Sequence, residues 1–210
     1  MKPAYWDEGI RILGERDPVL RALIATYPEV HLRRRSDAFT TLARAIVGQQ
    51  ISVKAAQSIW NRLVRAAHGP DAAALVPARV GRMQRRTLRA VGLSERKAEY
   101  LRDLARHFVS GKLDPSEWPH LEDEALIEAL VDVKGIGRCT AEMFLIFHET
   151  RADVLPVDDI GLQKAVAVHY YEGERQTPAA IRDLGAAWRP YRSIATWYLW
   201  RSLDPIPVEY

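Results

Sequence analysis

The sequence contains a single cysteine, Cys139, and no apolar run as long as the roughly 18 residues that a membrane span needs. One cysteine excludes an intramolecular disulfide, an iron–sulfur cluster held by thiolates and a zinc site built from cysteines. The N-terminal segment also lacks the apolar stretch and the small-residue cleavage site of a signal peptide. We therefore expect a soluble protein of the cytoplasm.

An excess of charge of one sign is missing as well. The 30 basic side chains face 27 acidic ones, so the formal net charge is only +3. Of the 30 basic residues, 24 are arginine, whose guanidinium group binds phosphate oxygens in a bidentate manner. This bias is compatible with phosphate binding, but a GC-rich genome would produce it equally well.

Alternating strand patterns are nearly absent, whereas helix start and stop signals recur. Asp17 and Pro18 form a cap and first-turn pair, and apolar residues repeat at helical spacing further on. The expected helices are Ser36 or Asp37 to Val47, Ser52 to Ala67, Ser94 to Ser110, Asp123 to Val131, Arg138 to Phe147, Ile160 to Tyr170, Pro178 to Ala187, and Ser193 to Arg201. The pattern predicts an all-α fold.

A chain of 210 residues with 48% hydrophobic content can form one large domain or two small lobes. We expect a middle helical lobe over residues 36–121 and a second lobe from residues 1–35 and 122–210. A cleft between the two lobes is the natural place for a site.

The segment VKGIGRCTAEMFL carries a Gly-x-Gly turn between two expected helices. Gly135 and Gly137 allow positive φ, and the amides of residues 135 to 140 should point outward at a helix N-terminus, where an anion is favoured. Lys134 and Arg138 add positive charge, and Thr140 adds a hydroxyl donor. A simple turn between two helices is the alternative interpretation.

Two carboxylates, Asp158 and Asp159, follow Pro156 and precede the apolar-periodic IGLQKAVAV. They therefore stand where a helix begins, and one alternative is that they only cap it and complement its dipole. The functional interpretation is that Asp158 caps the helix while Asp159 projects into the cleft.

These motifs resemble those of a known family. The helix-hairpin-helix pattern L-x-x-h-x-G-h-G-x-x-T-A, with h apolar, is filled by Leu130, Val133, Gly135, Ile136, Gly137, Thr140 and Ala141. With Asp159 lying 22 positions after Gly137, the chain resembles the HhH-GPD superfamily of DNA base-excision glycosylases. The segments AIVGQQISVKAA and WRPYRSIATWYLW resemble its alkylation-repair branch, the 3-methyladenine DNA glycosylases II of the AlkA type.

The resemblance implies an enzyme that flips alkylated purines, of the 3-methyladenine and 7-methylguanine type, out of duplex DNA and hydrolyses the N-glycosidic bond. Asp159 would be the catalytic carboxylate, and Gln50, with Gln49 and Ile51 as neighbours, the wedge. The DNA-binding hairpin would comprise Val133, Lys134, Gly135, Ile136, Gly137, Arg138 and Thr140. The base pocket would comprise Trp200, Cys139, Met143, Trp197 and Phe39. Further phosphate contacts are candidates at Arg33 to Arg35, Lys54, Arg85, Arg86 and Arg192, although such residues usually form a solvated surface.

Cys139 stands where the glycosylase-lyases of the family carry a lysine, so we expect no lyase activity and a water nucleophile. No cofactor is expected to be required. Hairpins of this family often hold a monovalent cation, Na⁺ or K⁺, through main-chain carbonyls, here those of Val131, Val133 and Ile136. The expected partner is double-stranded DNA with damaged bases, bound by a monomer at the nucleoid.

Two alternatives remain at this stage. The first is a non-catalytic helix-hairpin-helix module that binds DNA while Asp159 only caps a helix. The second is a related glycosylase for oxidised or mismatched bases, which would differ mainly in the pocket.

Overall fold

The computed structural model describes residues 2–28, 31–32, 37–69 and 74–203, and every regular element within these ranges is helical. The prediction of an all-α fold is therefore confirmed for the described residues. The elements in chain order are α1 (Trp6–Arg16), α2 (Pro18–Thr26), α3 (Ala38–Gly48), α4 (Val53–His68), α5 (Pro77–Arg82), α6 (Arg85–Ala90), α7 (Glu95–Val109), η1 (Trp118–His120), α8 (Asp123–Val131), α9 (Arg138–Phe147), α10 (Ile160–Tyr170), α11 (Pro178–Gly185), η2 (Ala186–Trp188) and α12 (Arg192–Leu203).

Helices with side-chain caps begin where the sequence signals place them. Asp37, Ser52 and Ser94 each accept a hydrogen bond from a first-turn amide at the start of α3, α4 and α7. Ser36, the other candidate cap of α3, lies outside the described residues. Helices α1, α5 and α6 were not expected from the sequence, and no side chain caps any of them.

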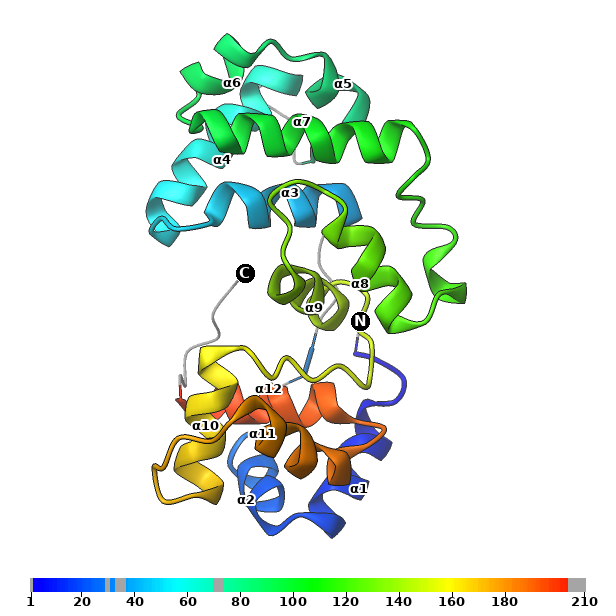
Figure 1. The fold of residues 1–210 in the computed structure, drawn as a ribbon, viewed down its shortest axis with the longest axis vertical. Helices are drawn as coiled ribbons and strands as arrows, with labels where there is room; N and C mark the ends of the chain where they lie inside the picture. The colour runs from blue at the N-terminus through cyan, green and yellow to red at the C-terminus, as the bar shows by residue number, and fades with distance from the viewer. Residues whose placement is uncertain (1, 29–30, 33–36, 70–73, 204–210) are drawn as a thin grey trace. The chain divides into compact units, whose positions relative to one another are not determined.

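The chain divides into two compact units, residues 1–34 with 145–210 and residues 35–144. In the first unit, α12 packs against α10, α2 and α1 (Figure 1). Buried Asp17 joins these helices, because its Oδ1 caps α2 while its Oδ2 accepts from Tyr170 Oη at 2.8 Å and Trp188 Nε1 at 3.0 Å. Burial also raises the pKa of the Tyr170 hydroxyl, so it remains a donor.

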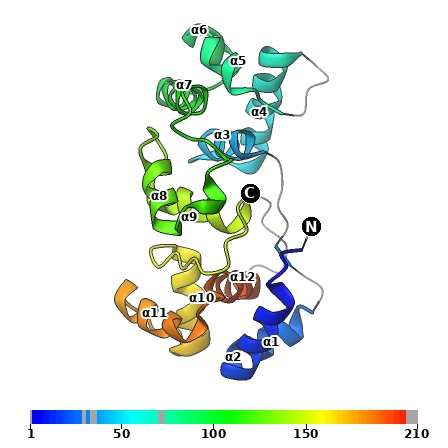
Figure 2. The same ribbon diagram turned by 90° about the vertical axis from the view of Figure 1, so that its right-hand side faces the viewer.

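The second unit is organised around α7, which packs against α3 on one side and against α5 and α6 on the other (Figures 1 and 2). Four aromatic rings form a chain of edge-to-face contacts through its core: Phe39, Phe108, Trp118 and Phe144. Such contacts stabilise a core beyond the burial of area alone. They connect α3 and α7 to η1 and α9.

The hairpin belongs to this second unit. The expected boundary between residues 121 and 122 would have placed it in the other lobe. The division falls instead between residues 144 and 145, within α9. The physical reason is that α7 binds the hairpin directly through the amide of Lys134, which donates to Asp103 Oδ2 at 2.9 Å. The Phe144 ring on Trp118 adds to this attachment.

None of the helices in the described residues is long and apolar enough to cross a membrane.

Candidate functional site

Asp159 is the N-cap residue of α10. Its backbone is extended, with φ −74° and ψ 124°, and its Oδ1 accepts a hydrogen bond from the Leu162 amide at 2.7 Å. The side chain is partly buried. A carboxylate at this position is stabilised by unpaired first-turn amides and by the helix dipole.

A second donor reaches the same oxygen. The indole Nε1 of Trp200, on α12, donates to Asp159 Oδ1 at 2.7 Å, and one face of that indole stacks on Phe147 with ring centroids 5.6 Å apart. No described residue donates a hydrogen bond to Oδ2. The carboxylate is therefore held in one orientation with Oδ1 engaged and Oδ2 available.

The prediction that Asp158 caps the helix is wrong. The Asp159 amide donates to the Pro156 carbonyl at 3.0 Å, and this turn brings Asp159 to the N-cap, whereas the side chain of Asp158 is exposed. Asp159 thus combines the capping role with the position expected of the reactive carboxylate. The two roles are compatible because capping uses only Oδ1.

Gly161, which was not predicted from the sequence, leaves the space that the hydrogen bond from Trp200 to Asp159 needs. A Cβ at Gly161 would lie 3.0 Å from Asp159 Oδ1 and 3.2 Å from Trp200 Nε1, so a side chain there would crowd the hydrogen bond. The available signal was a glycine in the first turn of a helix, where it is intrinsically unfavourable, two positions after Asp159.

The hairpin turn depends on Gly135, which adopts φ +83°. A Cβ at this residue would overlap the ring of Tyr100 on α7. The turn is closed by the Ile136 amide, which donates to the Val133 carbonyl at 3.1 Å. Gly137 differs, because its φ is not positive and the space around it is open.

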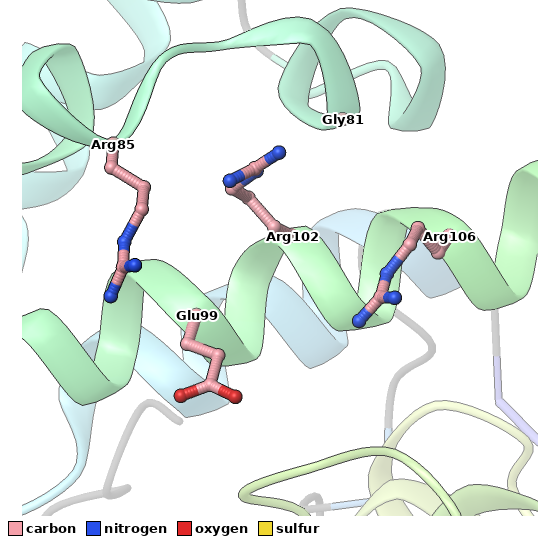
Figure 3. A pocket seen from close by; sticks show the side chains of 5 residues that line it. All are labelled: Gly81, Arg85, Glu99, Arg102 and Arg106. Atoms are coloured by element: carbon pink, nitrogen blue, oxygen red, sulfur yellow. The ribbon is translucent and has the colours of Figure 1, made fainter.

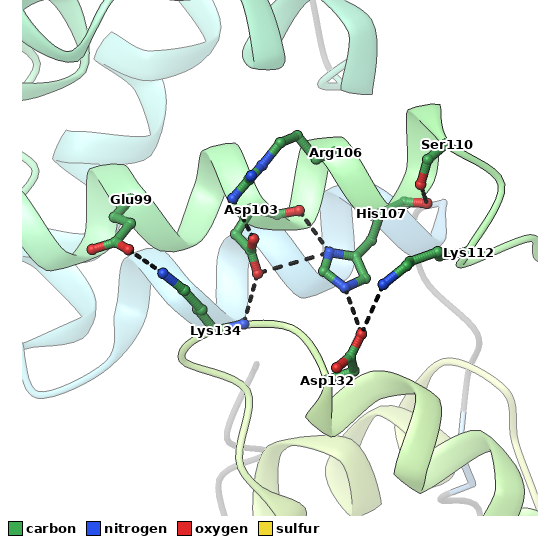
Figure 4. Close-up of polar contacts among 8 residues, drawn as sticks. All are labelled: Glu99, Asp103, Arg106, His107, Ser110, Lys112, Asp132 and Lys134. Carbon is green, nitrogen blue, oxygen red and sulfur yellow. Dashed lines mark hydrogen bonds and ion pairs between the residues drawn. The ribbon is translucent and has the colours of Figure 1, made fainter.

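Helix α7 holds the hairpin through a buried polar network (Figure 4). Asp103 Oδ2 accepts from the Lys134 amide, and its Oδ1 accepts from Arg106 at 2.6 Å. His107 Nδ1 lies 2.9 Å from the Asp103 carbonyl, and its Nε2 lies 3.0 Å from Asp132 Oδ2, at the end of α8. Asp103, Tyr100 and His107 were not predicted from the sequence because they lie about 30 residues before the motif, on another helix.

Both cationic side chains of the hairpin are paired with carboxylates. Lys134 Nζ lies 2.6 Å from Glu99, and this contact raises the pKa of Lys134. Arg138 forms a bidentate pair with Glu124 at 2.5 and 2.8 Å and a contact with Glu142 at 3.0 Å, and the Glu124 hydrogen bond raises the pKa of Arg138. These charges would have to exchange partners to bind a phosphate.

The expected outward amides are partly engaged in the turn itself. Within residues 135 to 140, the Ile136 amide donates to the Val133 carbonyl, whereas the amides of Gly137 and Arg138 have no acceptor within the described part of the chain. The Gly137 carbonyl accepts from Ala141 at 3.0 Å, so helix α9 starts here with its unpaired first-turn amides.

The turn between α3 and α4 carries the expected wedge. Gln50 is exposed and adopts φ +58°, a left-handed conformation that is rare for residues other than glycine. Gln49 Nε2 donates to the Gly135 carbonyl at 2.8 Å, so this turn is tied to the hairpin. Ile51 is 38% exposed.

Lys97, on α7, supports the same turn. Its Nζ donates to the carbonyls of Val47 at 2.8 Å and Gln49 at 2.6 Å, which satisfies carbonyls near the end of α3. Burial lowers the pKa of Lys97 from its ordinary value. With Tyr100 and Asp103, Lys97 forms a stripe at helical spacing, so one face of α7 supports both turns.

The five expected pocket residues fall into both units. Trp200 and Trp197 belong to the first unit, where Trp197 contacts Trp6 edge to face at 5.6 Å. Cys139 is exposed and Met143 is partly buried on α9 in the second unit. Phe39 is only 2% exposed and packs against Phe108, so it is a core residue, and its expected place in the pocket is corrected.

The other expected phosphate contacts have mixed outcomes. Arg33, Arg34 and Arg35 lie outside the described residues, and Lys54 and Arg86 are exposed. Arg85 pairs with Glu95. Arg192 makes an ion pair with Asp153 at 2.7 Å and also donates to its carbonyl, so its guanidinium holds the start of α12.

In the described ranges no group of three or more His, Cys, Asp or Glu side chains is placed to hold a metal ion. Any cation at the hairpin would thus depend on carbonyl oxygens.

The fold and these sites define a helical protein with a phosphate-compatible hairpin turn and a carboxylate oriented at a helix N-terminus. The family model described as HhH-GPD superfamily base excision DNA repair protein matches residues 43–190. The chain belongs to this superfamily.

Relatives and solved structures agree with this assignment. A putative DNA-3-methyladenine glycosylase of Bacillus subtilis is 31% identical over 79% of the chain, and the chain spans 59% of the length of that relative. The structure is similar to that of a DNA-3-methyladenine glycosidase from Bacillus halodurans, with TM-score 0.86, 37% identity, and coverage of 93% of this chain and 89% of that one. It is also similar to the 3-methyladenine DNA glycosylase of Schizosaccharomyces pombe in complex with abasic DNA, with TM-score 0.80, 29% identity, and coverage of 97% and 98%.

Proposed function

We propose that this protein is a DNA glycosylase of base excision repair that releases alkylated purines from duplex DNA. The observation that carries the proposal is the Asp159 carboxylate, whose Oδ1 is fixed by the Leu162 amide and Trp200 Nε1 while Oδ2 is available. The names of the relatives, which are 3-methyladenine glycosylases, support the substrate class.

Cleavage of an N-glycosidic bond develops positive charge on the sugar, as in other glycoside hydrolyses. Asp159 Oδ2 stabilises this charge and orients or deprotonates the attacking water. An alkylated purine of the 3-methyladenine type is already cationic and leaves readily, so little acid assistance is needed. A single oriented carboxylate is therefore sufficient for this reaction.

The target nucleotide has to leave the base stack before the carboxylate can reach its sugar. The exposed Gln50 side chain fills the space left in the duplex, with Gln49 and Ile51 beside it. The unpaired amides at Gly137 and Arg138, with the hydroxyl of Thr140, bind a backbone phosphate of one strand without reading sequence.

We propose that the flipped base is bound by the Trp200 indole, with Trp197 on the same helix of the first unit. Aromatic faces attract a cationic base by stacking and by cation–π interaction. Phe147 covers one face of the Trp200 indole, so only the other face can meet the base. The indole N–H orients Asp159 at the same time.

We further propose that the enzyme is monofunctional and stops after base release. The first turn of α9 carries the exposed Cys139 where a lyase of this family has a lysine. Without an amine at this position a Schiff base with the sugar cannot form in the manner of the family. Borohydride should therefore trap no covalent complex with DNA, and efficient trapping would refute the proposal.

A Na⁺ or K⁺ ion at the hairpin also remains a proposal. The carbonyls of Val131 and Ile136 accept no hydrogen bond from described residues outside the helices, and the Val133 carbonyl accepts one from Ile136 and keeps a second lone pair. These oxygens fit a monovalent cation, which would supply charge for an adjacent phosphate. The protein is proposed to act as a monomer.

The function is tested by incubating the protein with duplex DNA that contains methylated purines and measuring released bases by chromatography. Release of methylated purines, with none from unmodified duplex, is the expected result. Duplexes with an oxidised or a mismatched base run in parallel, and preferential release from these would assign the protein to a different glycosylase class. DNA binding without release of any base would identify a non-catalytic binding module.

A further inference from the structure

The second unit contains a cavity of about 350 Å³ between α5 and α7. The residues that line it are distant in sequence from Asp159. It is lined by Gly81, Arg85, Glu99, Arg102 and Arg106 (Figure 3). The lining thus carries three arginines and a single glutamate. This excess of positive charge suits an anion.

Three of the four charged side chains that line the cavity are paired with residues outside the lining. Arg85 pairs with Glu95, Arg106 pairs with Asp103 at 2.6 Å, and Glu99 pairs with Lys134 at 2.6 Å. The single carboxylate of the lining is therefore engaged by a lysine outside it. Carboxylates outside the lining balance Arg85 and Arg106.

Arg102 is the exception. It extends from α7 toward Gly81, and its Nε is buried with no hydrogen-bond acceptor in the described structure (Figure 3). It also forms no ion pair with a described carboxylate. Because this buried N–H lacks an acceptor, an occupant with oxygen acceptors would be favoured there.

A phosphate group would supply the hydrogen-bond acceptors and the negative charge that Arg102 lacks. Its oxygens accept several charge-assisted hydrogen bonds, and guanidinium groups bind it in bidentate geometry. We propose that the cavity lined by Arg85, Arg102 and Arg106 is a phosphate-binding site, occupied by a backbone phosphate of the DNA bound at the hairpin.

The contacts of α7 favour DNA as the source of this phosphate. Glu99 lines the cavity and binds Lys134 of the hairpin, and Asp103 binds both Arg106 and the Lys134 amide. The cavity and the hairpin are thus adjacent on one helix of the same unit, and a strand held by the hairpin amides can continue toward the cavity. Only the source of the phosphate rests on the proposed function.

The test measures DNA binding by fluorescence anisotropy at several KCl concentrations for the wild type, Arg102→Met and Arg96→Met. Arg96 is exposed on the same helix, lies outside the cavity and serves as a control for the loss of one charge. Each phosphate neutralised adds a slope of about −0.9 to log K against log salt concentration. Arg102→Met should flatten the slope by about 0.9, so that a change from 50 to 200 mM KCl weakens its binding about threefold less than that of the wild type. Arg96→Met should keep the wild-type slope.

In a second experiment, inorganic phosphate is titrated into all three proteins at constant ionic strength, and their thermal stability is measured. Equal salt slopes for all three proteins, with stabilisation by inorganic phosphate only where Arg102 is present, would overturn DNA as the source and assign a small phosphate ligand. Equal slopes without such stabilisation would overturn the site. A wild type that binds DNA but releases no base would refute the proposed function, and the comparison of the salt slopes would still test the phosphate site.

Discussion

Two turns of the second unit place a residue in the left-handed region of the backbone, and they do so differently. Gly135, in the hairpin, has φ +83°, and the ring of Tyr100 fills the place where its Cβ would be. Gln50, between α3 and α4, has φ +58° and carries an exposed side chain. A non-glycine residue in this region costs of the order of 1–2 kcal/mol.

The comparison indicates what each turn is built to present. At Gly135 the backbone itself has to approach its surroundings closely, so no side chain is tolerated. At Gln50 a side chain is retained in spite of the conformational cost, and strain that persists in this way points to a functional need. One turn exposes amides, and the other exposes a side chain.

Substitutions in the two turns, and in the residues that bind them, test this comparison through the free energy of unfolding. The largest loss is expected for Gly135→Ala, because the methyl group overlaps Tyr100 and the alanine is strained at positive φ. The two penalties together amount to about 2–4 kcal/mol in urea denaturation. Gly137→Ala is the control, since the space around Gly137 is open. Equal losses for the two variants would contradict the close approach at Gly135.

The second prediction concerns the network that holds the hairpin. Asp103→Ala leaves the Lys134 amide and Arg106 without their acceptor, which should cost about 1–3 kcal/mol and accelerate hydrogen exchange at the hairpin. Asp132→Ala removes a carboxylate of the same network that is 62% exposed and should cost less. A larger loss for Asp132→Ala would place the anchor of the hairpin elsewhere.

Gln49→Ala removes the direct hydrogen bond between the two turns. The expected loss is about 0.5–1.5 kcal/mol, together with a smaller population of flipped bases in a 2-aminopurine fluorescence assay. Gln57→Ala, on the exposed face of α4, removes a similar side chain without touching the hairpin. Identical behaviour of the two variants would show that the turns act independently.

The smallest change in stability is expected for Gln50→Gly. Glycine relieves the strain of the left-handed conformation but raises the conformational entropy of the unfolded chain. The free energy of unfolding should therefore increase by no more than about 1 kcal/mol. Base release should nevertheless fall, because the wedge is lost. Gln50→Ala keeps the strain and should lose the same activity. Full activity of either variant would remove Gln50 from the wedge role.

The helices on either side of the hairpin were predicted well from the sequence because their signals are local. The bounds Asp123–Val131, Arg138–Phe147 and Ile160–Tyr170 agree with the structure, since glycines and a capping carboxylate mark them directly. Helix α1 was missed because Tyr5, its N-cap residue, forms no side-chain cap. The two short helices α5 and α6 lack such caps as well.

The candidate catalytic site was predicted only in part. The carboxylate pair was visible in the sequence, but which member caps the helix depends on the turn at Pro156. The hydrogen bond from Trp200 joins residues 41 positions apart, and the one from Lys134 to Asp103 joins residues 31 apart. Such contacts depend on how helices pack, which neither periodicity nor motif spacing encodes.

The central claim is that Asp159 carries the reaction, and its most direct test is the rate of base release in a single turnover with protein in excess over methylated duplex. Asp159→Asn keeps the size of the side chain and an oxygen that can accept from Leu162 and Trp200, but it lacks the negative charge. We predict a fall in rate of about 100-fold or more, as for the loss of one electrostatic contact to a charged transition state. Asp158→Asn, its exposed neighbour, should retain the wild-type rate. An Asp159→Asn variant that is folded, binds DNA and releases methylated purines at the wild-type rate would contradict the account.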